Sequence, residues 1–312
     1  MNMIVLFLIF TLLSGCSSNI AHMISENKLS KPKFNVENSQ ALLISECEKE
    51  VLIKIGADIS QDKKMESIGG FEELAGEHDI YADEIYIDES LAAEKFILKC
   101  FAKGKTPYII LKDRQELSED EFIRCLEEFE TVLDKYPINV MIEVFENSYY
   151  TDPDGEKYKL FFDIVSNDSV SVGWSLDYDD IMFFDNYVPD ENVDFVCING
   201  YLNSDNDAKR FIQAIEDISD YDIVARFGYI YYSAETCKYT IDEMIRGIEN
   251  IYGSIKDIEN ISAIIYMDKN YMGNDQSNYN DYTITSENRI LEKYKTLIYD
   301  IRYDEGDDRF VE

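Results

Sequence analysis

The sequence predicts a single (β/α)8 barrel, an α/β fold in which eight parallel strands alternate with helices. Two observations support this prediction: the chain contains eight short runs rich in β-branched and aromatic residues, and amphipathic segments separate most of them. Continuous apolar runs are typical of strands that are buried on both faces of a parallel sheet. Eight strand–helix units in roughly 250 residues match the size of such a barrel. A doubly wound open sheet is the alternative, but the sequence lacks the glycine-rich phosphate-binding turn of that fold.

The expected strands and helices follow one another along most of the chain. The strands are expected at residues 51–57, 80–87, 107–112, 139–145, 170–174, 193–198, 223–227 and 261–267, and the helices at residues 90–103, 118–135, 207–218, 240–251 and 286–298. Ser118 and Glu121 have the spacing of a capping box at the start of one helix. No linker rich in Pro and Gly interrupts this order, so we expect one barrel over residues 48–303 and an acidic tail over residues 304–312.

The N-terminal residues predict export from the cytoplasm. Residues 3–13 are apolar except for Thr11, and the run ends in Leu13-Ser14-Gly15-Cys16. Such a run is typical of a secretory signal, and it is too short to cross a bilayer core of about 30 Å. The residues that end at Cys16 resemble a bacterial lipobox, in which the chain is cut before the cysteine and the thiol is diacylated.

We therefore expect a lipoprotein signal peptide at residues 1–15, a lipidated Cys16, and a polar tether up to residue 47. The expected location is extracytoplasmic, with the lipid anchoring the protein to the bacterial cell membrane. An ordinary signal peptide with an incidental cysteine is the alternative.

Composition excludes several classes of function. The net charge of −34 opposes binding to nucleic acid and adsorption to anionic lipid, so the acyl chain is the only membrane link that we expect. The hydrophobic content of 46% excludes a disordered chain. The five cysteines other than Cys16 form no CxxC pair, and both histidines are distant from these five in the sequence. We therefore expect no metal site and no cofactor, and we expect most of the cysteines to be reduced thiols in the core.

Polar and aromatic residues gather where the expected strands end. Active sites of (β/α)8 barrels lie at the carboxyl ends of the strands. In this chain, carboxylates and amides occur there among many tyrosines. Aromatic rings stack on the C–H face of a sugar ring while polar groups bind its hydroxyls, so this pattern predicts a carbohydrate-binding site. A general abundance of Tyr in the chain is the alternative explanation.

The most specific motifs lie between residues 169 and 201. One apolar run ends in Trp174-Ser175, a loop containing Tyr187-Val-Pro-Asp190 follows, and a second run leads from Val193-Asp194 to Asn199-Gly-Tyr201. This arrangement resembles the fifth and sixth strands of the β-mannanase-like barrels of glycoside hydrolase family 26. The resemblance implies that a β-linked polysaccharide or cell-wall glycan is bound. The candidate substrate-binding residues are Asn147, Trp174, Asn199, Tyr201, Tyr229 and Tyr266.

The resemblance also implies where catalytic residues belong. Retaining hydrolysis uses two carboxyl groups about 5–5.5 Å apart, one as acid/base and one as nucleophile. The fourth strand segment ends in Glu146-Asn147, which makes Glu146 the acid/base candidate. The seventh has Arg226-Phe-Gly where the family pattern is Glu-Phe-Gly, so Arg226 occupies the nucleophile position. An arginine stays charged at any accessible pH and cannot attack an anomeric carbon.

Three functions are consistent with these residues, and they leave open whether the protein is an enzyme. The first is a cell-surface lipoprotein that binds a β-linked polysaccharide with weak or no hydrolysis. The second is an active glycosidase that inverts configuration or has its nucleophile at Asp268 or Asp177. The third is a structural protein of the cell envelope. Arg226 favours the first and the third, and Trp174 with the neighbouring tyrosines favours the first.

Overall fold

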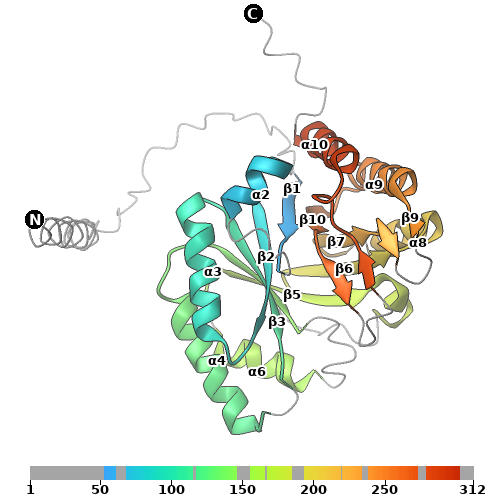
Figure 1. Ribbon diagram of the computed structural model, residues 1–312. Helices are drawn as coiled ribbons and strands as arrows, with labels where there is room; N and C mark the ends of the chain where they lie inside the picture. Colours follow the sequence, from blue (N-terminus) through green and yellow to red (C-terminus); the bar gives the residue numbers. More distant parts are fainter. Residues whose placement is uncertain are drawn as a thin grey trace, which may run out of the picture. The chain divides into compact units, whose positions relative to one another are not determined.

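The computed structural model describes residues 53–60, 68–114, 117–145, 155–165, 167–184, 193–218, 220–233, 238–272 and 279–302. They belong to one compact unit that begins at Val51. Eight parallel strands close into a barrel in the order β1-β10-β7-β6-β5-β4-β3-β2, with helices around it (Figure 1). The predicted (β/α)8 barrel is therefore confirmed. The expected signal peptide, Cys16, the tether and the acidic tail lie outside the described residues.

Each barrel strand coincides with one of the apolar runs in the sequence. The strands are β1 (Lys54–Asp58), β2 (Ile80–Tyr86), β3 (Thr106–Lys112), β4 (Val140–Val144), β5 (Val170–Asp177), β6 (Phe195–Leu202), β7 (Ile223–Tyr229) and β10 (Ile261–Met267). Strands β5 and β6 continue past their expected ends. They do so because their ladders extend through the pairs Asp177↔Asn199 and Leu202↔Tyr229, so a neighbouring strand still pairs beyond Ser175 and Asn199, where polar residues interrupt the apolar runs.

All five expected helices are present, and the described residues form three shorter ones as well. The helices are α2 (Ile68–Ala75), α3 (Ser90–Lys103), α4 (Glu119–Leu133), α6 (Glu156–Ile164), the 3₁₀ helix η1 (Tyr178–Phe183), α8 (Asp205–Glu216), α9 (Ile241–Ile255) and α10 (Asn288–Arg302). The capping box is confirmed, since the Glu121 carboxylate accepts hydrogen bonds from the backbone N–H and the hydroxyl of Ser118 at 3.0 and 2.6 Å. No helix within the described ranges is both long enough and apolar enough to span a membrane.

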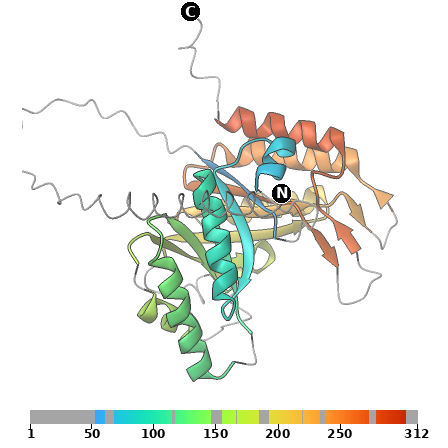
Figure 2. The ribbon, with the colours of Figure 1, turned by 60° about the vertical axis from the view of Figure 1, so that its left-hand side comes forward.

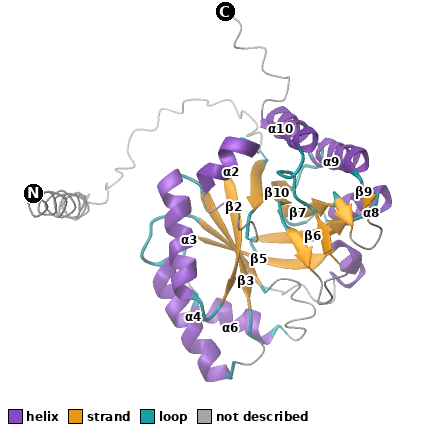
Figure 3. Cartoon of the chain, viewed as in Figure 1, coloured by secondary structure: helices purple, strands orange, loops and turns teal. Residues whose placement is uncertain are grey.

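A second, smaller sheet extends from the barrel after β7 and β10. We call it the accessory sheet; its strands β8 (Tyr232–Ser233), β9 (Lys238–Tyr239), β11 (Asn270–Met272) and β12 (Tyr279–Asp281) pair in the antiparallel order β11-β12-β8-β9. Figures 2 and 3 show these short strands outside the barrel. The sequence did not predict this sheet because strands of two or three residues are too short to show an alternating pattern.

Side chains alternate along each barrel strand between two cores. One core fills the barrel interior and contains Ile80, Ala82, Tyr108, Ile110, Phe195, Cys197, Val224, Ala263 and Ile265. The other lies between the strands and the surrounding helices and is much larger. Cys100, Cys125 and Cys197 are buried free thiols, as expected for reduced core cysteines. The same alternation decides which polar residues enter the barrel.

Candidate functional site

Arg226 is completely buried inside the barrel, in the middle of β7. Its guanidinium group bonds side chains from three other strands. Nε donates to Oδ1 of Asn199 at 2.8 Å, Nη1 donates to Oδ2 of Asp58 at 3.1 Å, and Nη2 donates to Oε1 of Glu143 at 3.2 Å. One side chain thus connects β7 to β1, β4 and β6.

Strand register explains the first of these contacts. Asn199 and Arg226 are partners in the β6–β7 ladder, so their side chains enter the barrel next to each other. Asn199 also donates through Nδ2 to Oε1 of Glu143 at 3.1 Å, and the Tyr108 hydroxyl donates to Oε2 at 3.0 Å. Both oxygens of Glu143 therefore accept hydrogen bonds. A carboxyl group that is 0% exposed needs such partners to replace the hydrogen bonds that water would otherwise supply.

A second buried cation lies beside Asp58. Lys269, just after β10, is 1% exposed, and its Nζ lies 3.1 Å from Oδ2 of Asp58 and 2.6 Å from Oε1 of Glu84. We call the six residues Asp58, Glu84, Glu143, Asn199, Arg226 and Lys269 the barrel network. Lys112 approaches it from the edge, with Nζ 3.6 Å from Oε2 of Glu84. Among the described residues, the cations Arg226, Lys269 and Lys112 thus pair with the carboxylates Asp58, Glu84 and Glu143.

The environment of Asp58 keeps that carboxylate ionised. Burial by itself would raise its pKa, but the charges of Lys269 and Arg226 and hydrogen bonds from Ser60 and Lys269 outweigh burial and hold the pKa below its ordinary value. Burial opposes the charge of Lys269 as well, and the neighbouring Asp58 raises the pKa of the ammonium group. Each charge is therefore stabilised by the other.

This arrangement supports ion pairing rather than acid/base catalysis. Retaining hydrolysis needs a protonated carboxyl and a second carboxylate that is free to attack. Within the described ranges, Asp58 and Glu143 are 0% exposed and both bind the guanidinium of Arg226. Neither side chain combines the freedom and the access that a nucleophile requires. The described residues also contain no group of His, Cys, Asp and Glu arranged to hold a metal ion.

Three of the sequence-predicted site residues lie in or beside the barrel network. Asn199 and Arg226 belong to it. Tyr201 lies at its edge, with Nζ of Lys269 5.8 Å from the centre of its ring and the ring of Tyr282 at 5.1 Å. Glu146, Asn147 and Cys16 lie outside the described residues.

Three other candidates point away from the barrel interior, which contradicts their expected contact with substrate. Trp174 is 3% exposed and packs edge-on against Phe184 in the core beneath the helices. Tyr229 and Tyr266 lie in the same core, and the Tyr266 hydroxyl donates to the backbone oxygen of Tyr282 at 2.9 Å. The reason is strand alternation, since these residues occupy the positions between those that face inward.

The two carboxylates considered as relocated nucleophiles have local structural roles. Asp268 is 0% exposed, and its carboxylate accepts hydrogen bonds from the N–H of Ile284 at 2.6 Å and the hydroxyl of Thr285 at 3.0 Å. Asp177 precedes η1 and accepts a hydrogen bond from the N–H of Asp179 at 3.0 Å. Both contacts hold loops in place, which argues against catalysis by either residue.

Glu84 and Lys269 are members of the barrel network that the sequence reasoning missed. Glu84 follows Ile80 and Ala82 at alternate positions of β2, so the same strand face that carries the inner core ends in a carboxylate. This alternation was a usable signal. Lys269 lies beyond the end of β10, where a pattern of alternation no longer applies.

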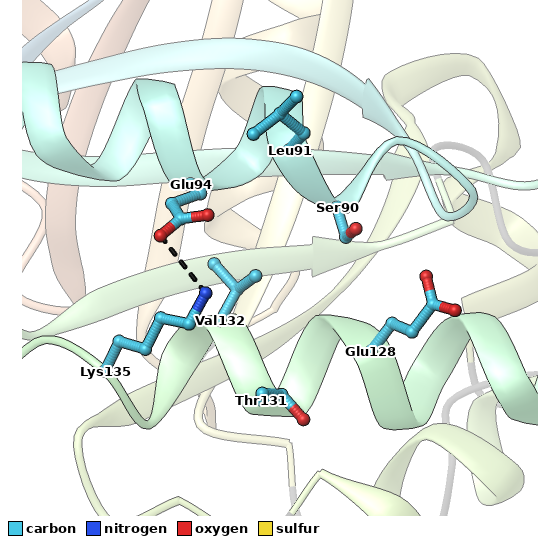
Figure 4. A pocket seen from close by; sticks show the side chains of 7 residues that line it. All are labelled: Ser90, Leu91, Glu94, Glu128, Thr131, Val132 and Lys135. Atoms are coloured by element: carbon cyan, nitrogen blue, oxygen red, sulfur yellow. Dashed lines mark hydrogen bonds and ion pairs between the residues drawn. The ribbon is translucent and has the colours of Figure 1, made fainter.

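A surface hollow between α3 and α4 is separate from this network. It is lined by Ser90, Leu91, Glu94, Glu128, Thr131, Val132 and Lys135 (Figure 4). Two of its charged groups pair with each other, since Nζ of Lys135 lies 3.2 Å from Oε1 of Glu94. None of the lining residues belongs to the barrel network, so we do not assign the function to this hollow.

No protein-family model and no curated protein sequence matches the chain. Solved structures match its fold. They include a double mutant of the Cellulomonas fimi endo-β-1,4-mannanase, with a TM-score of 0.58 and 11% identity over 80% of this chain and 71% of that chain. A Bacteroidetes-affiliated GH5 cellulase has a TM-score of 0.54 and 12% identity over 82% and 92% of the two chains. A GH113 β-1,4-mannanase has a TM-score of 0.53 and 14% identity over 78% and 98%. The chain thus shares the (β/α)8 barrel fold of these enzymes.

Proposed function

We propose that this chain binds a β-linked polysaccharide through a barrel of the glycoside hydrolase type and hydrolyses it weakly or not at all. The observation that carries the proposal is the position of Arg226. It stands where the resemblance to family 26 implies the nucleophile, and it is bonded to both Asp58 and Glu143. The fold that the chain shares with two mannanases and a cellulase supports the choice of polysaccharide.

Loss of hydrolysis follows from charge as well as from the missing carboxylate. The transition state of glycoside hydrolysis resembles an oxocarbenium ion, so a carboxylate near the anomeric carbon stabilises it. The guanidinium of Arg226 would oppose that positive charge instead. It also holds Asp58 and Glu143 in ion pairs, so neither replaces the nucleophile.

The proposal places the protein on the outer face of the bacterial membrane, held by lipid on Cys16. The support is the sequence Leu13-Ser14-Gly15-Cys16 after an apolar run. Acylation by more than one chain gives stable attachment, whereas a single chain binds marginally. Mass spectrometry of the purified protein is expected to find acyl chains on an N-terminal Cys16. A Cys16→Ser variant that remains in the membrane fraction at the parent level would contradict the anchor.

The decisive experiment measures binding and turnover on the same glycans. We would incubate the purified protein with β-mannan, glucomannan, xylan and mixed-linkage β-glucan, and follow reducing-sugar release beside binding by affinity electrophoresis. Binding to at least one glycan without sugar release is the expected result. Turnover that Glu146→Ala abolishes would establish an active glycosidase, and neither binding nor turnover would favour a structural protein of the envelope.

A further inference from the structure

Three tyrosines gather on the accessory sheet. The ring of Tyr239 lies 4.7 Å from that of Tyr232 and 5.4 Å from that of Tyr231, measured between ring centres. Tyr239 is 62% exposed, and the other two are partly exposed. Large aromatic side chains normally bury most of their area, so one exposed and two partly exposed rings in contact are a candidate binding surface. We call these three residues the tyrosine platform.

Backbone hydrogen bonds fix the platform from two sides. The N–H of Tyr231 donates to the backbone oxygen of Asp281 at 2.7 Å, which ties the platform to β12. The N–H of Thr240 donates to the backbone oxygen of Tyr231 at 2.9 Å. The Thr240 hydroxyl donates to the backbone oxygen of Ile230, also at 2.9 Å. Tyr232 and Tyr239 are also direct partners in the β8–β9 ladder. A surface that is ordered before binding loses less entropy when a ligand arrives.

The platform lies at the end of the barrel where the strands terminate. Tyr231 and Tyr232 follow β7, the strand that carries Arg226. The neighbouring strand β12 leads directly into Tyr282, whose ring lies 5.1 Å from that of Tyr201, at the edge of the barrel network. A glycan bound at the carboxyl ends of the strands would therefore pass close to the accessory sheet.

We propose that the tyrosine platform is a subsite that stacks on a pyranose ring of a neutral β-linked glycan. This inference rests on the function proposed above and adds the place of a binding contact and the charge class of the ligand. The phenol rings are uncharged and supply apolar faces for stacking, with the planes of Tyr232 and Tyr239 tilted by 41° to each other. The net charge of −34 repels polymers of uronic acid, so the ligand class is neutral.

The chain offers a matched control for this proposal. Tyr299 lies on α10 and is 61% exposed, almost the same as Tyr239 at 62%, but it does not belong to the accessory sheet. Tyr239→Ala and Tyr299→Ala remove the same exposed ring from two places. Circular dichroism and thermal unfolding of both variants are expected to match the parent, because an exposed ring contributes little to folding.

The experiment compares parent, Tyr239→Ala, Tyr239→Phe and Tyr299→Ala for binding to glucomannan, xylan and polygalacturonate. The Tyr239→Ala variant is expected to bind neutral glycan with about tenfold lower affinity than the parent, because it loses one stacking contact. Tyr239→Phe and Tyr299→Ala are expected to bind like the parent, and polygalacturonate is expected not to bind.

Unchanged binding by Tyr239→Ala would overturn the subsite while the proposed function stands. An equal loss in Tyr239→Ala and Tyr299→Ala would also overturn it, because the effect would not depend on the platform. Preference for polygalacturonate would overturn the neutral class. If the parent binds no glycan, the proposed function fails and the subsite fails with it.

Discussion

Nη2 of Arg226 lies 3.2 Å from Oε1 of Glu143, and both side chains are 0% exposed. The pair crosses the barrel interior from β7 to β4. The same guanidinium also pairs with Asp58 on β1, where Nη1 lies 3.1 Å from Oδ2. Burying charges costs free energy that ion pairing offsets only when each group keeps its partners. The barrel network is therefore a structural element that depends on Arg226.

Replacing Arg226 by Met is expected to destabilise the fold strongly. The change leaves Asp58 and Glu143 buried without this cation, and losing one partner of a buried ion pair costs about 3–5 kcal/mol. Urea unfolding followed by circular dichroism measures the loss. Arg210→Met is the control, because Arg210 is 51% exposed and pairs with Asp179 at the surface, which is worth less than about 1 kcal/mol. Equal losses in both variants would contradict the structural role of the barrel network.

Replacing Arg226 by Glu is expected not to restore hydrolysis. The new carboxylate would lie beside Asp58 and Glu143, and of these two described acids only Asp58 pairs with Lys269, at 3.1 Å. Repulsion among the three carboxylates destabilises the barrel. Reducing-sugar release from β-mannan and the free energy of unfolding are measured together. Turnover by a stable Arg226→Glu protein would show that one substitution alone abolished catalysis.

The buried His78 is expected to make stability depend on pH. Burial lowers its pKa from 6.5 to about 4, and its ring nitrogens lie 2.8 Å from the Gly76 backbone oxygen and 2.7 Å from the Tyr294 hydroxyl. Between pH 6.5 and 4 the unfolded chain binds a proton that the folded chain does not. This residue's contribution to stability is therefore present above pH 6.5 and falls by about 3 kcal/mol as the pH decreases to 4.

The His78 contribution is isolated by comparison with His78→Gln, which does not titrate in this range. Unfolding free energies of the two proteins are measured by urea denaturation at pH 7.5, 6, 5 and 4. The difference between parent and variant is expected to shrink as the pH falls. A difference that is constant with pH would show that His78 does not titrate as its burial implies.

Two glycines of α9 are expected to respond in opposite ways to replacement by Ala. A Cβ atom at Gly247 would lie 2.1 Å from the ring of Tyr229, whereas one at Gly253 would meet nothing within 4 Å. Gly247→Ala therefore overpacks the core and costs about 1–3 kcal/mol. Gly253→Ala is expected to stabilise the helix by about 0.5–1 kcal/mol. Thermal unfolding of the two variants checks the sign, and a stabilised Gly247→Ala protein would contradict the packing of Tyr229 on α9.

The barrel was predictable because its strands are buried on both faces and leave continuous apolar runs in the sequence. The long helices were predictable because one apolar stripe repeats at helical spacing, as in α4. The accessory sheet was not, because β8 has two residues and its pairing depends on β12, which is distant along the chain. Trp174 shows the limit for single residues. Its strand reads Val170-Ser-Val-Gly-Trp174, so alternation places Trp174 on the same face as Val170 and Val172, but it does not reveal whether that face meets the helices or the barrel interior.

The sequence by itself determined that Arg226 occupies β7 and that its side chain carries a permanent positive charge. It did not determine what that charge binds. Asp58 and Glu143 are 168 and 83 residues away in the chain, and closure of the barrel brings both to the same guanidinium. Local sequence sets the chemistry of a side chain and the strand that carries it. Strand order and register set its partners, and these depend on packing over the whole barrel.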